Sequence, residues 1–494
     1  MQKLGFDNEK YIKIQSEQIR KRISEFGGKL YMEFGGKLFD DHHASRVLPG
    51  FAPDSKLKML LELKDQAEIV IAVSAPSLAA NKQRRDLGIT YDLEVLRLID
   101  LFRSVGLYVG SVVITQYDGE KAANALKNRL TGNGIPVFIH YRIPGYPSDI
   151  PYIVSDEGYG RNEYIETTRS LVVLTAPGPG SGKMAACLSQ LYQEHKKGIN
   201  AGYAKFETFP IWNIPLKHPV NLAYEAATAD LNDVNMIDPY HFEAYGEVTV
   251  NYNRDVEVFP VLNAIFEQIY GTSPYKSPTD MGVNMVGHCI MDNDCVCDAS
   301  KQEILRRYYS ALCDAKRSGE PSEEASKIEL IMKNAGITLA DRKVAEAALR
   351  VEEETGTPAA AIQLSDGKII TGKTKDLLGC SAAVVLNSLK YLAGIPDETE
   401  LIPSYLIEPV QDLKTTYLGS KNPRLHIDEI LIALSVSAAN NPIAAQALSM
   451  LPHLNGCEAH SSVILSEADD SIFRKLKVNL TCEPRYQSNN LYHL

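Results

Sequence analysis

The residues that decide the fold are SLVVLTAPGPGSGKMAACLSQLYQEHKKG, at positions 170–198. The run SLVVLT is β-branched and leucine-rich, which predicts a buried strand, and the apolar residues after Lys183 recur at helical spacing as far as Gly198. Between the strand and the helix, closely spaced glycines allow backbone N–H groups to face an anion at the positive end of the helix. This order predicts a phosphate-binding loop, with the cofactor-binding residues Gly178, Gly180, Ser181, Gly182 and Lys183.

The loop departs from a standard phosphate loop at two positions. Pro177 stands where a glycine is usual, and Met184 stands where a Ser or Thr hydroxyl would ligate magnesium. A thioether is a poor ligand for a hard cation, so magnesium would need carboxylate or water ligands instead. The alternative interpretation is a tight strand-to-helix turn followed by an exposed lysine.

The sequence before this stretch alternates short strands with amphipathic helices. Leucines three and four residues apart predict helices over 54–66 and 91–106. Apolar and β-branched runs predict strands at 30–34, 68–73, 107–115, 135–141 and 170–175. Such alternation indicates an α/β fold with a doubly wound, mostly parallel sheet, which binds ligands at the carboxyl ends of its strands.

The chain as a whole is predicted to have three parts. A P-loop-like α/β domain covers 1–299, a helical connector covers 300–356, and a smaller C-terminal α/β domain covers 357–494. The connector is expected to open with a capping box formed by Ser300 and Glu303.

Three shorter signals predict turns and caps. In the C-terminal domain, Asp366-Gly367 predicts a hairpin between two short strands, and Asn441 before a proline predicts a helix N-cap. Near the N-terminus, EFGGKL occurs twice, at 25–30 and 33–38, and each glycine pair is expected to make a turn beside the first strand. Direct phosphate contact by Gly35, Gly36 and Lys37 is the alternative for the second copy.

Composition limits the classes of partner. The 494 residues carry a formal net charge of −11, which is not the electrostatic pattern of a protein that binds nucleic acid or anionic membranes. The opening residues have no signal-peptide core, and the eight cysteines lack the dense spacing of a secreted scaffold, so we expect a cytoplasmic protein with free thiols. Small-molecule substrates and other copies of the chain, in a homo-oligomer, are the expected partners.

A polar stretch after residue 227 gathers carboxylates that suit magnesium. Asp230 and Asp238 are predicted metal ligands within it, and His241 between them and the next strand is a candidate general base. Polar loops carry such residues for other reasons as well, so solvent-facing side chains are the alternative.

A cluster of thiols and imidazole spans His288 to Asp298 and includes Cys289, Cys295 and Cys297. It lacks the paired Cys-x-x-Cys spacing of a structural zinc site, so no zinc is expected. Cys297 precedes an expected helix start, where the helix dipole would favour a thiolate. Buried, unreactive thiols are the leading interpretation.

The region after the glycine loop resembles the synthetase domain of CTP synthetase and related P-loop ligases. The carrying segments are KFETFPIWNIPL, with Lys205, and YGEVTVNYNRDVEVF, with Asp255. The resemblance implies that Lys183 and Lys205 are catalytic residues that hold phosphates, and that Asp255 is a third magnesium ligand. No counterpart of that family's glutaminase part is found.

Over nearly its whole length the chain resembles the bacterial family called domain of unknown function eighteen-forty-six. The segments that carry this resemblance include EFGGKLFDDHHASRVLPGF, TAPGPGSGKMAACLSQLYQEH, FETFPIWNIPLKHPVNLAYEAATADLNDVNMIDPYH and GCEAHSSVILSEADD. It implies a bacterial multidomain α/β protein that self-associates. We therefore expect an enzyme that uses ATP or another nucleoside triphosphate, with magnesium, for phosphoryl transfer or ligation. The alternative is a non-catalytic sensor of a nucleotide or phosphorylated metabolite.

Overall fold

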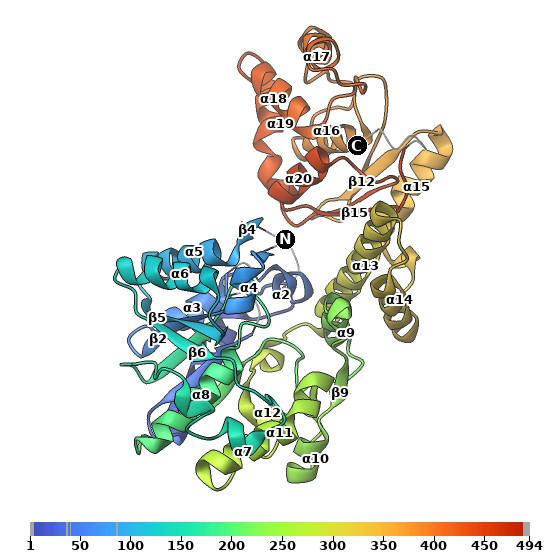
Figure 1. Cartoon of the computed structure of the whole chain (residues 1–494). Helices are drawn as coiled ribbons and strands as arrows, with labels where there is room; N and C mark the ends of the chain where they lie inside the picture. Colours follow the sequence, from blue (N-terminus) through green and yellow to red (C-terminus); the bar gives the residue numbers. More distant parts are fainter. Residues whose placement is uncertain (1–3, 36–37, 40, 85–86, 488–494) are drawn as a thin grey trace. The chain divides into compact units, whose positions relative to one another are not determined.

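A computed structural model describes residues 4–35, 38–39, 41–84 and 87–487 of the chain (Figure 1). These residues form two compact units. The N-terminal unit contains Leu4–Glu225 and Asp233–Cys297, and the C-terminal unit contains Ala226–Asn232 together with the chain from Asp298 onward. In Figure 1 the N-terminal unit runs from blue to yellow-green and the C-terminal unit ends in red.

The N-terminal unit is built around a seven-stranded sheet. The spatial order is β11-β8-β1-β7-β2-β5-β6, and every neighbouring pair is parallel. The strands are β1 (Leu30–Phe34), β2 (Ala67–Ser74), β5 (Tyr108–Tyr117), β6 (Val137–Tyr141), β7 (Leu171–Thr175), β8 (Gly202–Phe206) and β11 (Gly282–Val283). The predicted α/β class and the five predicted strands are confirmed.

Helices cover both faces of this sheet (Figure 1). On one face, Leu188 of α8 and Phe266 of α11 share a core with Tyr31 and Val172 of the sheet. Every residue of β2 is buried, so alternate residues such as Ile71 are covered on the other face of the sheet. A strand with helices on both sides has this pattern. The helices of this unit are α1 (Asn8–Glu25), α2 (His42–Val47), α3 (Ser55–Glu62), α4 (Ala75–Ala79), α5 (Tyr91–Ser104), α6 (Lys121–Gly132), α7 (Ile150–Ile153), α8 (Lys183–Lys196), α10 (Pro239–Tyr245), α11 (Asn253–Tyr270) and α12 (Pro278–Met281).

Two small antiparallel ribbons complete the unit. They pair β3 (Gln83–Arg84) with β4 (Ile89–Thr90), and β9 (Asn235–Ile237) with β10 (Val250–Tyr252). Two helices run across the unit boundaries in sequence, namely α9 (Pro219–Ala227) and α13 (Asn293–Ser318).

The C-terminal unit packs helices on a smaller mixed sheet. Its strand order is β13-β12-β14-β15, antiparallel except for the β14–β15 pair. The strands are β12 (Ala359–Gln363), β13 (Ile369–Lys373), β14 (Glu458–Ser461) and β15 (Asn479–Cys482). The helices after α13 are α14 (Glu323–Ala335), α15 (Lys343–Thr355), α16 (Cys380–Leu392), α17 (Ser404–Asp412), α18 (Ile427–Ala438), α19 (Pro442–Ser449) and α20 (Glu467–Lys475).

Buried arginines tie the predicted connector to this sheet. Arg342 is fully buried, and its guanidinium donates to Gln302 of α13, Glu458 of β14 and Thr481 of β15, and to the carbonyls of Ala459 and Asn479. Arg306 of α13 also pairs with Glu458, and Glu303 accepts from Arg306 and Arg307. We call Glu303, Arg306, Arg307, Arg342 and Glu458 the arginine network. The three-part division of the chain stays a prediction, and these contacts place residues 300–356 with the C-terminal sheet.

The local signals have mixed outcomes. The hairpin is confirmed, with Gly367 at φ 86°, and Asn441 caps α19 by accepting from the N–H groups of Ile443 and Ala444. The Ser300–Glu303 capping box is wrong: α13 begins at Asn293, so Ser300 and Glu303 lie inside the helix and are buried.

The glycine pairs have different outcomes as well. Gly27 and Gly28, both at positive φ, make the turn between α1 and β1. Gly36 and Lys37 lie outside the described residues.

All eight cysteines are free thiols. None of the described helices combines the length and the apolar character needed to cross a membrane.

Candidate functional site

The glycine loop joins the end of β7 to the start of α8, as predicted. Gly180 and Gly182 have φ of 72° and 75°, a conformation that side chains other than glycine rarely adopt. A Cβ at Gly178 would overlap the Tyr91 hydroxyl, so glycine is also required there for space. The hydroxyl of buried Ser181 donates to the Gly178 carbonyl at 2.5 Å.

The N-terminus of α8 is left without a side-chain cap. Gly182 is its N-cap residue and has no side chain that could accept from the first-turn N–H groups. Thr115 of β5 donates to the Ser181 carbonyl at 2.8 Å and so holds the loop in place. Loop and helix end together provide N–H groups and a positive dipole for an anion.

The loop lies at the point where the strand order reverses. The chain leaves β1 and passes over β7 to reach β2, and it leaves β7 and passes over β1 to reach β8. In open α/β sheets, ligands bind at the carboxyl ends of the strands at such a switch point. The carboxyl ends of β1 and β7 therefore define the candidate site.

Lys183, the first residue of α8, contacts β1. Its Nζ lies 3.6 Å from Oε1 of Glu33, and both side chains are largely shielded from solvent. Glu33 Oε2 in turn accepts from the Tyr203 hydroxyl of β8 at 2.9 Å. Lys183 is therefore fixed at the end of the central strands by a carboxylate that an incoming anion would have to compete with.

Lys205 lies beside Glu33 in the register of β8 against β1. It pairs with Asp255, in the first turn of α11, and with Glu207 at 2.8 Å, and it lies over the Tyr252 ring. Burial lowers the pKa of the Lys205 ammonium, but Asp255, Glu207 and Glu33 outweigh burial and hold that pKa above its ordinary value. Lys205 is therefore a permanent positive charge.

The carboxyl of Glu207 is buried beside Lys205. Burial raises the pKa of Glu207 to about 7, with Asp255 adding to the rise and Lys205 opposing it. We call Glu33, Lys183, Lys205, Glu207 and Asp255 the lysine network. With three carboxyls and two ammonium groups, it can bind or release a proton near neutral pH when the charge at the loop changes.

His241 lies in a separate cavity of the same unit, of about 250 Å³. Its Nδ1 is 2.9 Å from the Ser277 hydroxyl and 3.7 Å from Asp280 Oδ1. Trp212 forms part of the cavity wall, and a Cβ at Gly282 would overlap Trp212 and lie 3.6 Å from Glu207 Oε2. The cavity therefore lies next to the lysine network, and the role of His241 as a base stays a prediction.

The three predicted magnesium ligands have different surroundings. Asp238 is fully buried and caps α10: its two oxygens accept from Tyr240 N, His241 N, Thr279 N and the Thr279 hydroxyl. Asp230 is exposed and belongs to the C-terminal unit, whereas Asp255 belongs to the N-terminal unit. Across the described residues, no group of three or more His, Cys, Asp or Glu side chains is arranged to hold a metal ion.

The predicted cysteine cluster divides into buried and half-buried thiols. Cys289 is buried, and burial raises its pKa to about 11, as expected for an unreactive thiol. Cys297 is half-buried and lies inside α13 rather than before it. Its Sγ is 3.6 Å from Nε2 of His218 and 3.6 Å from Nδ2 of Asn293. His218 is 79 positions earlier in the sequence, so no local spacing pattern could have shown this contact.

Sequence reasoning also missed Glu33 and Glu207. Both are acidic residues at the carboxyl end of an apolar strand, in LYMEF and in GYAKFE. A charge at a strand position that the pattern predicts to be buried was the available signal, because such a charge needs a partner.

Comparison with known proteins identifies the family. The model of "Domain of unknown function DUF1846, N-terminal" matches residues 4–336, and that of "Domain of unknown function DUF1846, C-terminal" matches residues 340–492. The chain belongs to the DUF1846 family. Its relatives include UPF0371 protein SUB1165 of Streptococcus uberis, 57% identical, and UPF0371 protein stu1377 of Streptococcus thermophilus, 56% identical, each aligned over 492 residues that make up 100% of both chains.

These matches confirm the family resemblance expected from the sequence. DUF1846 membership carries over no reaction, so the activity has to be argued from the site. The likeness of the middle region to P-loop ligases stays a prediction.

Proposed function

We propose that the Gly178–Lys183 loop and the lysine network bind the phosphates of a nucleoside triphosphate, and that this DUF1846 protein uses it for phosphoryl transfer to, or ligation of, a small-molecule substrate. The observation that carries the proposal is the loop itself: an uncapped helix N-terminus with Lys183, at the switch point of a parallel sheet. ATP is the first candidate ligand.

Each group has a defined task in this proposal. The first-turn N–H groups of α8 and the Lys183 ammonium donate to phosphate oxygens, where negative charge accumulates during transfer. Glu33 holds Lys183 in position without ligand, and Lys205 supplies a second positive charge at the adjacent strand end. Glu207 takes up a proton as the anion enters, since added negative charge raises a carboxyl pKa further.

Magnesium would be held by phosphate oxygens, water and Asp255 rather than by the full predicted set. Asp238 has both oxygens occupied by hydrogen bonds, and Asp230 is exposed to solvent. Asp255 could bind magnesium, because magnesium prefers oxygen ligands such as a carboxylate.

A metal-free sensor is the second candidate function. It is favoured by Met184, which offers no hydroxyl at the usual ligand position, and by the pairing of Asp255 with Lys205. Binding without magnesium and without steady phosphate release would identify a sensor. Self-association, also part of this proposal, is measured by native mass spectrometry.

Calorimetric titration with ATP and GTP tests the site. Lys183→Ala should weaken binding by about ten- to hundredfold, because one charge-assisted contact is worth roughly 1.5–3 kcal/mol. Glu33→Gln should tighten binding several-fold, because it removes the competing carboxylate while keeping the side-chain shape. Lys196→Ala, at the other end of α8, is the matched control and should bind like the parent protein. Equal affinity in the parent and Lys183→Ala would reject the site.

A further inference from the structure

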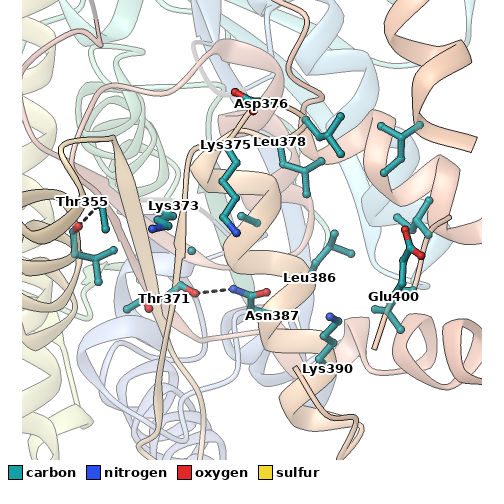
Figure 2. A pocket seen from close by; sticks show the side chains of 17 residues that line it. Thr355, Thr371, Lys373, Lys375, Asp376, Leu378, Leu386, Asn387, Lys390 and Glu400 are labelled. Carbon is teal, nitrogen blue, oxygen red and sulfur yellow. Dashed lines mark hydrogen bonds between the residues drawn. The ribbon is translucent and has the colours of Figure 1, made fainter. Parts of the chain in front are cut away.

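We propose that the C-terminal unit contains a second binding site, for a small organic anion with an apolar body. The site is a cavity of about 660 Å³ beside β13 and α16 (Figure 2). This volume lies within the range of cavities that enclose small ligands. All of its lining residues belong to the C-terminal unit, so it is independent of the loop site in the N-terminal unit.

Most of the cavity wall is apolar. Leucine, isoleucine, valine and alanine side chains line it from α15, from the loop before α16, from α16 itself, from the segment that leads into α17 and from α17. They are Val351, Leu377, Leu378, Ala383, Leu386, Leu401, Ile402 and Ile407. A ligand that fills this wall gains by burying apolar surface.

The polar part of the wall includes three lysines. Lys373 ends β13, Lys375 follows it in the loop, and Lys390 lies near the end of α16. Figure 2 shows Lys375 and Lys390 pointing their ammonium groups toward the part of the cavity where Asn387 lies. Lysine is a compact point charge that suits an anion with several equivalent oxygens.

The lysines keep most of their charge available. In the described part of the chain, no carboxylate oxygen lies within 4.0 Å of the Nζ of Lys373 or Lys375. Lys390 donates to the Asp397 backbone carbonyl at 2.8 Å, which holds its ammonium at the cavity without neutralising it. Two carboxylates, Asp376 and Glu400, also line the cavity, so the lysines outnumber them by one.

The wall is also fixed in shape before a ligand arrives. A Cβ at Gly372 would lie 2.3 Å from the Val384 nitrogen, so β13 packs directly against α16. Asn387 donates to the Thr371 carbonyl at 2.8 Å and links the same two elements (Figure 2). A preformed cavity loses less binding free energy to ordering than a flexible surface does.

The first experiment compares two fluorescent probes on the full-length protein. Anilinonaphthalene sulfonate is an apolar body with one anionic group, and N-phenyl-1-naphthylamine is the same body without it. The double variant Lys375→Gln/Lys390→Gln should bind the sulfonate probe about tenfold more weakly than the parent, because it lacks two charges in the cavity. Both proteins should bind the neutral probe equally.

Matched variants isolate the cavity. Lys368→Gln changes an exposed lysine near the hairpin turn and should leave sulfonate binding unchanged. Lys183→Ala should also leave it unchanged, so this proposal can fail or hold independently of the nucleotide site. Coincident melting curves of all variants confirm that folding is intact.

Competition then distinguishes two sources of the anion. Displacement of the sulfonate probe mainly by phenyl phosphate assigns the cavity to phosphate esters, and displacement mainly by benzoate assigns it to carboxylates. Failure of both to displace the probe, or equal sulfonate affinity in the parent and the double variant, would overturn the proposal.

Discussion

The two units each bury a network of charged side chains, and the networks differ in kind. In the arginine network, Arg342 uses all five of its N–H donors on fixed acceptors, two of them backbone carbonyls. In the lysine network, two point charges face three carboxyls, one of which has a pKa of about 7. Arg342 therefore has no spare donor, whereas the lysine network can change its protonation and its partners.

This difference separates a structural network from a candidate site. The arginine network joins α13 and the start of α15 to strands of one sheet, so a change of partner there would separate secondary-structure elements. The lysine network lies where a glycine loop and a helix N-terminus leave N–H groups without a side-chain cap. Buried titratable groups beside such donors are typical of functional sites.

The largest expected effect is on the arginine network. Arg342→Ala should lower the free energy of unfolding of the C-terminal unit by about 3–5 kcal/mol, because it removes five hydrogen bonds from a buried site and one of the two arginine partners of Glu458. The free energy of opening, measured by hydrogen exchange in peptides that cover β14 and β15, is the observable.

The control for this prediction is an exposed arginine. Arg474 pairs with Asp470 at 2.9 Å on the surface of α20, with 73% of its side chain exposed. Arg474→Ala should change the opening free energy by less than about 1 kcal/mol. If Arg342→Ala has an equally small effect, the arginine network does not stabilise the C-terminal sheet, and this difference between the two networks is lost.

The fold was largely predictable, because its signals are local. The strands of the N-terminal unit show as apolar and β-branched runs, and the glycines at 178–182 directly indicate a tight loop before a helix. The capping box at Ser300 and Glu303 shows the limit of local patterns. The same two residue types fit a buried helix interior where Glu303 has arginine partners.

The second prediction concerns pH and the lysine network. The folded-state pKa of Glu207 is raised above its unfolded value, so the folded protein binds more protons than the unfolded chain between about pH 4.5 and 7. The free energy of unfolding of the N-terminal unit should therefore fall as pH rises through this window, by up to about 3 kcal/mol from this group. Glu207→Gln should flatten that dependence.

Urea unfolding from pH 5 to 8 measures this effect. Trp212 is the chain's single tryptophan and lies in the N-terminal unit, so its fluorescence reports on that unit. Glu257→Gln, an exposed position on α11, is the control and should keep the parent's pH dependence. Identical pH profiles for the parent and Glu207→Gln would show that Glu207 does not cause the pH dependence of the free energy of unfolding.

The site was less predictable than the fold because it depends on register and on helix caps. Glu33 meets Lys205 only because β1 pairs with β8 in one particular register. Asp238 was predicted as a metal ligand, yet an N-cap aspartate and a metal-binding aspartate look the same in a sequence. The two roles are distinguished only in the structure, by the groups that donate hydrogen bonds to both oxygens of Asp238.

The last and smallest effect is on magnesium-dependent binding. Asp255→Asn keeps the side-chain shape and removes the charge, so in an enzyme it should weaken nucleotide binding in the presence of magnesium by about tenfold. Binding measured without magnesium should change much less. Asp230→Asn and Asp238→Asn should match the parent within about twofold in both conditions, because Asp230 is exposed to solvent and Asp238 has its oxygens occupied.

The outcome for these three variants chooses between the two functions. An effect of Asp255→Asn that requires magnesium supports the enzyme. In that case the Asp255 carboxylate would leave Lys205 and bind the cation. If all three variants match the parent with and without magnesium, the carboxyls serve only to hold the lysines, and the sensor becomes the better description. In that case the lysine network would resemble the arginine network after all: a fixed arrangement whose only ligand contacts are the loop N–H groups and Lys183.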